Sequence, residues 1–496
     1  MKGTFVCRRF AYAGLLCMLT ACAVPTVVDT RPEAQSSAAQ STAAYYQSLL
    51  GSDGTPPEIA KLRLFMASMP KGGDIHHHYS GALFAETYLE WVDKAGYCIS
   101  RSDFKVNTSG KPAAASGLAG KTSDECLSVA SVVSDDRFYR GLLQRWSDKD
   151  FRNHGVLTSP PDEHFFDTFG YFSRVATLDY PAGLMSLKRR AVAEHVQYIE
   201  TMVRGAPTLA SPDMTFDDNA RRLMAQSNEE ALAALLASFG QDLANNARFG
   251  ADVTEYAAFP QSVHAGLDDD DFILRYQTYT SRNSPPSIVF SGLYAAFAAA
   301  SRNPLIVGVN LVGPENGAVS MRDYALHMRM IRYLKTRFPT VKLSLHAGEL
   351  ALGMVPPEGL TFHIREAVDI AGADRIGHGV DIAFERDALM LLKTMHDKPV
   401  SVEINLTSNA FILGVRGTRH PLSIYRDADV PFVISTDDAG VSRNDLTSQY
   451  VMFAAGYRPS YALLKETALR SIDRSFLDDA EKSRQRTRLI DRFDAF

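Results

Sequence analysis

The hydrophobic positions of this chain fall into short β-rich runs, separated by longer segments in which apolar residues recur with helical spacing. This alternation is typical of parallel βαβ units, because each helix returns the chain to the same edge of the sheet. Eight runs are predicted to be strands: 74–79, 196–203, 272–280, 305–312, 342–347, 375–379, 401–406 and 431–436. Eight such units favour a closed TIM-type (β/α)8 barrel over an open doubly wound sheet.

Two intervals between the predicted strands are too long for a simple helical crossover. The first, at about residues 92–162, is rich in Gly, Ser and Ala, and we interpret it as a subdomain or large loop inserted after the first strand. The second, 204–270, has a helical pattern that is clearest at 229–239, and an acidic run follows at 268–271. Such a run is more typical of a solvated loop than of a cation site. Residues 45–496 therefore fit one barrel domain with additions.

The N-terminal segment has the pattern of a targeting sequence. Basic residues precede an apolar run at 10–19, which is too short to span a bilayer and predicts a signal peptide over residues 1–21. Residues 19–22, Leu-Thr-Ala-Cys, are similar to a bacterial lipobox, in which Cys22 would carry the lipid. The alternative is plain secretory cleavage after Ala23.

The segment at residues 22–44 is rich in Ser, Ala, Thr and Gln. Such a composition buries too little apolar surface to offset the entropy of ordering, so we expect a flexible tether. Together with Cys22, it predicts an exported bacterial protein: a membrane-anchored lipoprotein that faces the periplasm or the cell exterior.

Export also bears on the remaining cysteines. Cys98 and Cys126 would be the two left in the mature fold, and an oxidising compartment lets them pair. A bridge that closes a loop of about 28 residues would stabilise the fold by about 3–4 kcal/mol. Two unpaired thiols are the alternative.

The overall composition, 46% hydrophobic and 22% charged, is that of an ordinary globular protein with a sizeable core. A formal net charge of -5 argues against a nucleic-acid partner, because such binding depends on neutralising phosphates. A small-molecule ligand is favoured, and membrane contact is expected only through the N-terminal lipid. The sequence leaves open whether several copies associate.

Three consecutive histidines in the first predicted strand are the first candidates for chemistry. Side chains alternate along a strand, so His76 and His78 share one face while His77 points into the surrounding helical layer. Two neutral imidazoles at this spacing suit zinc, whose bonds to histidine nitrogen are about 2.0–2.1 Å long. An isolated pair of this kind is equally consistent with packing histidines.

Further acids and bases fall at the carboxyl ends of later predicted strands. His346 and Glu349 follow the fifth strand, His378 closes the sixth, and Asp437 and Asp438 follow the eighth. Barrel active sites are built at that rim. The adjacent aspartates can both reach it only if the strand ends there. The set therefore predicts a metal site with catalytic side chains.

These motifs resemble those of the adenosine deaminases in the amidohydrolase superfamily. The matching pieces are Met-Pro-Lys at 69–71 leading into the paired histidines, His-Ala-Gly-Glu at 346–349, Arg-Ile-Gly-His-Gly at 375–379 and Ser-Thr-Asp-Asp at 435–438. Their order and spacing cover most of the chain from about residue 65 onward. The exported form, the opening motif and the cysteine-bearing insertion look most similar to the secreted adenosine deaminase growth factor branch.

The resemblance implies one zinc ion per chain, with a water or hydroxide completing its shell. The implied ligands are His76, His78, His346 and Asp437. Glu349 would donate a proton to purine N1 as the water attacks C6, which requires a desolvated site that raises its pKa. His378 would orient that water and stabilise the developing charge.

The resemblance also implies substrate contacts. Asp438 would hydrogen-bond to purine N7, and the backbone of Gly313 would face N3. Ser80 stands where the compact deaminases usually carry an aspartate that helps to hold the ribose, so ribose recognition departs from the family pattern.

The implied activity is the hydrolytic deamination of adenosine, and of 2′-deoxyadenosine, to inosine and ammonia. One alternative is a deaminase of another aminopurine or of AMP in the same fold. A nucleotide would demand Arg or Lys for its phosphate, and no such cluster is identified near these motifs. The other alternative is a protein that binds a purine nucleoside without turnover.

Overall fold

The structure is a computed structural model, and it describes residues 37–52, 54–109, 126–149 and 159–496. The predicted signal peptide, Cys22 and the first part of the predicted tether lie outside the described residues. No helix in the described part of the chain is both long enough and apolar enough to cross a membrane.

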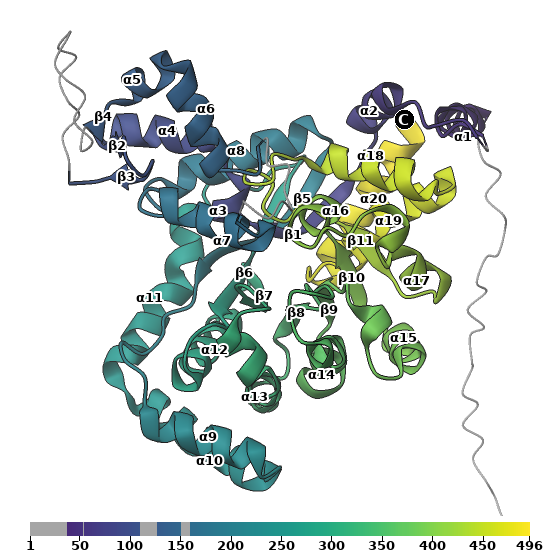
Figure 1. Ribbon diagram of the computed structural model, residues 1–496. Helices are drawn as coiled ribbons and strands as arrows, with labels where there is room; N and C mark the ends of the chain where they lie inside the picture. The colour runs from purple at the N-terminus through teal and green to yellow at the C-terminus, as the bar shows by residue number, and fades with distance from the viewer. Residues whose placement is uncertain (1–36, 53, 110–125, 150–158) are drawn as a thin grey trace, which may run out of the picture.

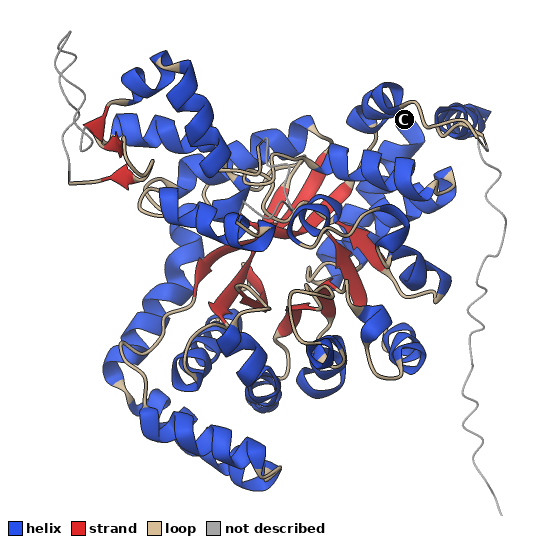
Figure 2. Ribbon diagram, viewed as in Figure 1, coloured by secondary structure: helices blue, strands red, loops and turns tan. Residues whose placement is uncertain are grey.

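An eight-stranded parallel sheet forms the centre of the molecule (Figures 1 and 2). Its strands are β1 (Gly72–His78), β5 (Val196–Gly205), β6 (Ile273–Ser281), β7 (Ile306–Val312), β8 (Lys342–Ala347), β9 (Arg375–His378), β10 (Ser401–Ile404) and β11 (Phe432–Ile434). They neighbour one another in chain order. All eight predicted strands are confirmed, with bounds that differ by two residues or fewer.

The sheet closes through a contact between its first and last strands. His77 pairs with Asp437 in a parallel bridge. The backbone N–H of Asp437 donates to His76 O at 2.9 Å, and that of His78 donates to Asp437 O at 3.3 Å. These contacts nearly close the barrel, which confirms the predicted TIM-type fold.

Helices cover the outside of this barrel (Figure 2). Those that follow the strands are α8 (Tyr180–Ala193), α12 (Pro286–Ala300), α13 (Ala318–Arg337), α14 (His363–Glu366), α15 (Ala388–Asp397), α17 (Leu422–Asp427), α19 (Tyr461–Asp473) and α20 (Asp479–Ala495). Among them α12 is apolar on nearly all sides, and it is buried on nearly all sides because neighbouring helices cover its outer face.

Additional helices pack beside the barrel and its insertion. They are α2 (Ile59–Ser68), α3 (Tyr79–Ala82), α4 (Ala85–Lys94), α7 (Pro161–Phe172), α16 (Leu406–Ile412) and α18 (Leu446–Tyr457). Short irregular helices complete the chain: η1 (Pro357–Leu360), η2 (Ala367–Ala371), η3 (Ile382–Phe384) and η4 (Gly417–Arg419).

The last residues of the segment predicted to be a tether are helical. Residues from Ser37 onward form α1 (Ser37–Leu49), whose Ala-rich sequence has high helix propensity. Tyr46 and Leu49 are buried, and the Tyr46 hydroxyl donates to Pro459 O at 3.2 Å. The helix thus begins within the segment expected to be a tether, and the buried side chains that anchor it, Tyr46 and Leu49, follow that segment.

The insertion predicted at about residues 92–162 contains a small antiparallel sheet beside the barrel (Figure 1). Its elements are β2 (Cys98–Ser100), β3 (Val106–Asn107), β4 (Cys126–Leu127), α5 (Val129–Ser134) and α6 (Asp136–Arg145). Cys98 and Cys126 form a disulfide that joins β2 to β4.

The second long interval holds α9 (Met214–Ala225), α10 (Glu229–Asn245) and α11 (Ala247–Val263). The helical pattern at 229–239 is confirmed within α10. In the acidic run that follows, Asp268 accepts a hydrogen bond from Leu274 N at 2.9 Å and pairs with Arg275 at 2.7 Å. This carboxylate therefore holds the turn that leads into β6.

Candidate functional site

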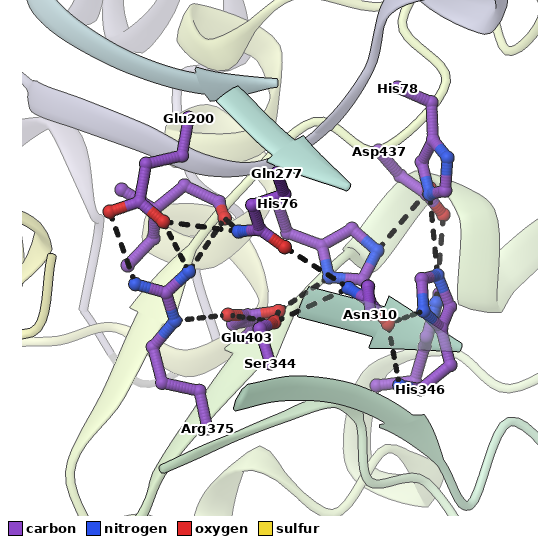
Figure 3. A network of polar contacts seen from close by, with 12 residues as sticks. His76, His78, Glu200, Gln277, Asn310, Ser344, His346, Arg375, Glu403 and Asp437 are labelled. Carbon is purple, nitrogen blue, oxygen red and sulfur yellow. Dashed lines mark hydrogen bonds and ion pairs between the residues drawn. The ribbon is translucent and has the colours of Figure 1, made fainter. Parts of the chain in front are cut away.

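Four of the predicted site residues meet at the carboxyl ends of the barrel strands (Figure 3). His76 and His78 come from β1, His346 from β8, and Asp437 follows β11. All but His78 are buried, and the His78 side chain is 15% exposed. His77 points the other way and bonds to Thr201 Oγ1 through Nδ1 at 2.9 Å, as strand alternation predicts.

The spacing of the ligand atoms fits one tetrahedral ion. Bonds of about 2.0–2.1 Å in a tetrahedral shell place neighbouring ligand atoms about 3.3–3.4 Å apart. His78 Nε2 lies 3.3 Å from His346 Nε2 and 3.3 Å from Asp437 Oδ1, and His76 Nε2 lies 3.5 Å from the same Asp437 oxygen. The Nε2 atom of His76 is buried and has no hydrogen-bond partner among the described residues. This nitrogen is therefore available to a cation at the centre of the cluster.

Hydrogen bonds on the sides that face away from the cluster orient the candidate ligand side chains. His76 Nδ1 lies 2.6 Å from Glu403 Oε2, and His346 Nδ1 lies 2.8 Å from Asn310 Oδ1. Since these acceptors take the Nδ1 protons, both Nε2 lone pairs point towards the centre of the cluster. The carboxylate of Asp437 is oriented in the same way, because its Oδ2 accepts a hydrogen bond from Ser408 Oγ at 2.5 Å.

A buried ion-pair chain continues behind His76 (Figure 3). Arg375 donates to Glu403 at 2.5 Å and to Glu200 at 2.6 Å, and all three side chains are almost completely buried. Burial alone would raise the pKa of Glu403, but Arg375 and His76 outweigh it and lower that pKa to about 2. Sequence reasoning missed Glu403, although a carboxylate in the apolar strand Ser-Val-Glu-Ile is an unusual residue that signals a buried partner.

His378 lies beside the cluster, at the end of β9. Its Nε2 atom is 3.7 Å from Glu349 Oε1 and 3.8 Å from Asp437 Oδ2, and it has no hydrogen-bond partner in the part of the chain that the structure describes. Burial lowers the pKa of His378 to about 3, against the opposing charge of Asp437. The structure brings this histidine close enough to join a cation set with His76, His346 and Asp437.

Glu349 follows β8 and is almost completely buried. Burial raises the pKa of its carboxyl well above the ordinary value, and the charge of Asp437 raises it further. Its backbone is fixed by Glu315, whose two oxygens accept from Gly348 N at 3.0 Å and Glu349 N at 2.9 Å. The desolvated setting expected for a proton donor is therefore present.

Asp438 is also buried beside this group. Strand β11 ends at Ile434, so the chain is free to turn at Asp437, whose φ of 62° is in the left-handed region. Both adjacent aspartates consequently reach the same rim, as expected. Burial raises the pKa of Asp438 well above its usual range, as does the charge of Asp437.

The two remaining predicted contacts lie at the ends of other strands. Gly313 follows β7 with a φ of 97°, which favours glycine. Ser80 lies in α3 and borders a cavity of about 260 Å³, which Arg204 also lines. Sequence reasoning missed Arg204, because the distance along the chain hides its position at the end of the neighbouring strand β5.

Comparison with known proteins adds a family likeness to this geometry. Residues 274–495 match the family model described as adenosine deaminase. An adenosine deaminase from Clostridium perfringens is 27% identical over 186 residues, covering 37% of this chain and 51% of that protein. An adenine deaminase from Rhizobium leguminosarum is 31% identical over 208 residues, covering 41% and 58%. The chain thus spans about half the length of the curated relatives it matches.

Solved structures share the fold. An N6-mAMP deaminase from arabidopsis superposes with a TM-score of 0.54 at 18% identity, over 86% of this chain and 99% of that one. An adenine deaminase from Arthrobacter aurescens gives 0.51 at 15% identity, over 85% and 98%. An amidohydrolase from Burkhoderia ambifaria with bound Zn gives 0.50 at 16% identity, over 87% and 93%.

Proposed function

We propose that the chain, whose residues 274–495 match the family model described as adenosine deaminase, is a zinc-dependent hydrolase that converts adenosine to inosine and ammonia. The observation that carries this proposal is the convergence of His76, His78, His346 and Asp437 at tetrahedral spacing beside the buried Glu349, whose pKa burial raises.

The donor set suits zinc. Three imidazole nitrogens and one carboxylate oxygen are ligands that zinc prefers, and the oriented Nδ1 atoms leave the lone pairs directed inward. The bound Zn of the similarly folded Burkhoderia ambifaria protein supports the same ion here. When bound, zinc would lower the pKa of a coordinated water from 15.7 to about 7.

The protein side chains would manage the protons and the purine. Glu349, whose pKa is raised, can hold a proton at neutral pH and donate it to purine N1. His378 faces Glu349 and Asp437 and would hold the attacking water. Asp438, whose pKa burial also raises, would donate to the lone pair at N7, and the backbone of Gly313 would face N3.

A second candidate substrate is a nucleoside monophosphate such as AMP. Arg204 lines the cavity beside Ser80, and a guanidinium there would complement a phosphate. An N6-mAMP deaminase has the same fold, and adenine deaminases are among the relatives. Adenosine, adenine and AMP are therefore the compounds to distinguish. The complete acid, base and metal set disfavours the remaining alternative, a nucleoside-binding protein without turnover.

A substrate panel tests the proposal. Protein purified without residues 1–21 is supplied with zinc and mixed separately with adenosine, 2′-deoxyadenosine, AMP and adenine, and conversion is followed by loss of absorbance. We expect adenosine and 2′-deoxyadenosine to be deaminated fastest, and a strong chelator to abolish the reaction. A preference for AMP or adenine would identify that compound, and not adenosine, as the substrate. Binding of zinc and adenosine without turnover of any compound would overturn the enzymatic proposal.

We also propose that the protein is exported through residues 1–21 and lipidated at Cys22, as in a bacterial lipoprotein. The basic and apolar pattern of the segment supports this, and the disulfide of the insertion is compatible with an oxidising compartment and with the secreted growth factor branch. Mass spectrometry of the protein expressed in bacteria should find a diacylglyceryl group on Cys22, and a Cys22→Ala variant should leave the membrane fraction. Wild-type protein cleaved after Ala23 would contradict the lipidation.

A further inference from the structure

A chain of three buried hydrogen bonds connects a backbone amide to the ring of His378. It begins at His420, which lies between η4 and α17 and is 1% exposed. Leu422 N donates to His420 Nδ1 at 3.2 Å. Because a backbone N–H is always a donor, His420 Nδ1 must carry a lone pair. Burial also lowers the pKa of His420 to about 4, so the ring is neutral and its proton is on Nε2.

The second hydrogen bond fixes the orientation of the Asn409 side-chain amide. His420 Nε2 lies 3.0 Å from Asn409 Oδ1, and Asn409, in α16, is completely buried. Since His420 donates through Nε2, the atom that it meets must be the amide oxygen of Asn409. The orientation of this amide therefore follows from its hydrogen bond to His420.

The third bond reaches the site. Asn409 Nδ2 lies 2.9 Å from His378 Nδ1. An amide NH2 only donates, so His378 Nδ1 must accept, and the proton of this neutral ring must be on Nε2. This is the reverse of His76 and His346, whose Nδ1 atoms face acceptors and whose Nε2 atoms carry lone pairs.

We propose that Asn409 and His420 are positioning residues that hold His378 as the Nε2–H tautomer, so that His378 acts as a hydrogen-bond donor towards the site and not as a metal ligand. The geometry decides between two overlapping cation sets, since a protonated nitrogen cannot bind a metal. It favours His76, His78, His346 and Asp437, whose ligand atoms lie 3.3 to 3.5 Å apart, over the group that contains His378. The catalytic part of this inference rests on the proposed function; the tautomer does not.

The direct test is the position of the proton. In protein labelled with ¹⁵N-histidine, long-range ¹H–¹⁵N correlation spectra distinguish an Nε2–H ring from an Nδ1–H ring, and a His378→Gln variant assigns the signal. We expect wild-type His378 to be Nε2–H with and without zinc. An Nδ1–H ring, or a shift of His378 Nε2 typical of metal binding when zinc is added, would overturn the proposal.

Asn409→Asp tests the consequence. A carboxylate at position 409 accepts from both histidines, so it should turn His378 into the Nδ1–H tautomer. We expect kcat for the best substrate to fall about 10³- to 10⁴-fold, as is typical of a wrong catalytic tautomer. KM should stay within about threefold and zinc at one ion per chain. A reversed tautomer with kcat within threefold of wild type would refute the role.

Asn303→Asp is the matched control. Asn303 is equally buried but donates to Ala257 O and Gln261 on the outside of the barrel. It should show the cost of a buried carboxylate without any change in the His378 spectrum. An equal loss of kcat in both variants would reduce Asn409 to a structural role.

His420 gives a second route if Asn409→Asp does not fold. His420→Phe frees the amide of Asn409 to rotate, and we expect a mixture of His378 tautomers and a fall in kcat of at least about tenfold. His420→Gln, whose amide can still donate to Asn409 Oδ1, should restore most of both. Unchanged tautomer and kcat in His420→Phe would contradict the proposal. If wild-type protein deaminates no compound, the proposed function fails, and the spectra still decide the tautomer.

Discussion

Gly81 touches the carboxylate of Asp438: a Cβ atom at position 81 would lie 1.5 Å from Asp438 Oδ1. The same segment of α3 accepts hydrogen bonds from the backbone N–H groups of Gly440 and Val441 through Gly81 O. The turn after β1 and the turn after β11 are therefore packed so closely that only glycine fits between them. The position of Asp438 depends on this contact.

Gly81→Ala should move Asp438 without removing any proposed ligand. A displacement of about 1 Å in a substrate-positioning group costs about 10²-fold in rate, so we expect kcat/KM for adenosine to fall by about that factor while zinc content stays at one per chain. Gly170→Ala, in α7, is the control because no atom lies within 4 Å of the added Cβ. It should change kcat/KM by less than twofold. Equal activity of the two variants would show that Asp438 does not touch the purine.

Glu349→Gln should separate metal binding from proton transfer. The amide cannot supply a proton, so we expect kcat to fall about 10²- to 10⁴-fold. The proposed ligands are unchanged, and zinc measured by elemental analysis should stay at one per chain. The control is Glu358→Gln, an exposed glutamate in η1, which should behave as wild type. Near-normal turnover of Glu349→Gln would remove it from the mechanism.

Glu403→Gln should lower the affinity of the proposed site for zinc. The carboxylate accepts from His76 Nδ1 at 2.6 Å, and loss of such a partner typically lowers metal affinity about 10- to 100-fold. Competition with a chromophoric chelator measures this affinity directly. Glu200→Gln is matched to it, because Glu200 also pairs with Arg375 but contacts no proposed ligand. Both variants should lose stability, and only Glu403→Gln should lose zinc.

Much of the site was accessible from sequence because strand geometry fixes it. Alternation places His76 and His78 on one face, and parallel strands bring His346 and Asp437 to the same rim. Asp438 joined them for the same reason, once the strand ended before it.

The orienting residues were not accessible in this way. Asn409 and His420 come from a short helix and a loop, and their contact with His378 depends on how α16 and α17 pack against the barrel. Local pattern does not encode that packing. The helix at residues 37–49 was missed for a related reason. Its sequence is rich in polar residues, and it packs on α2 and α19, which local pattern does not predict.

Asp445 links two helices outside the site and should make stability depend on pH. It caps α18 through Ser448 N at 2.6 Å and binds Arg63 of α2 through two bonds of 2.7 and 2.6 Å. Burial would raise the pKa of Asp445, but these bonds outweigh it and lower the pKa to about 2. A depressed pKa means that the stabilisation is present above the unfolded-state pKa of about 3.9 and is lost as pH falls towards 2.

We therefore expect Asp445→Asn to lower the free energy of unfolding by about 1 kcal/mol at pH 7, after allowance for solvent screening of the exposed Arg63. Urea unfolding at a series of pH values should show the difference from wild type shrinking below pH 4 and vanishing near pH 2. A difference that persists unchanged at pH 2 would show that the pair does not titrate as described.

The closing contact of the barrel has a mechanical consequence. The first strand supplies two proposed ligands and Asp437, three residues after the end of the last strand, supplies another, at the place where few backbone hydrogen bonds join the described parts of the two strands. An ion bound there would connect the first and last strands of the sheet at the place where few backbone hydrogen bonds join them. Metal-free protein should then loosen along this seam first, with amides of β1 and β11 exchanging with solvent faster than those of β6 and β7. The ion proposed for catalysis would then also stabilise the closed barrel.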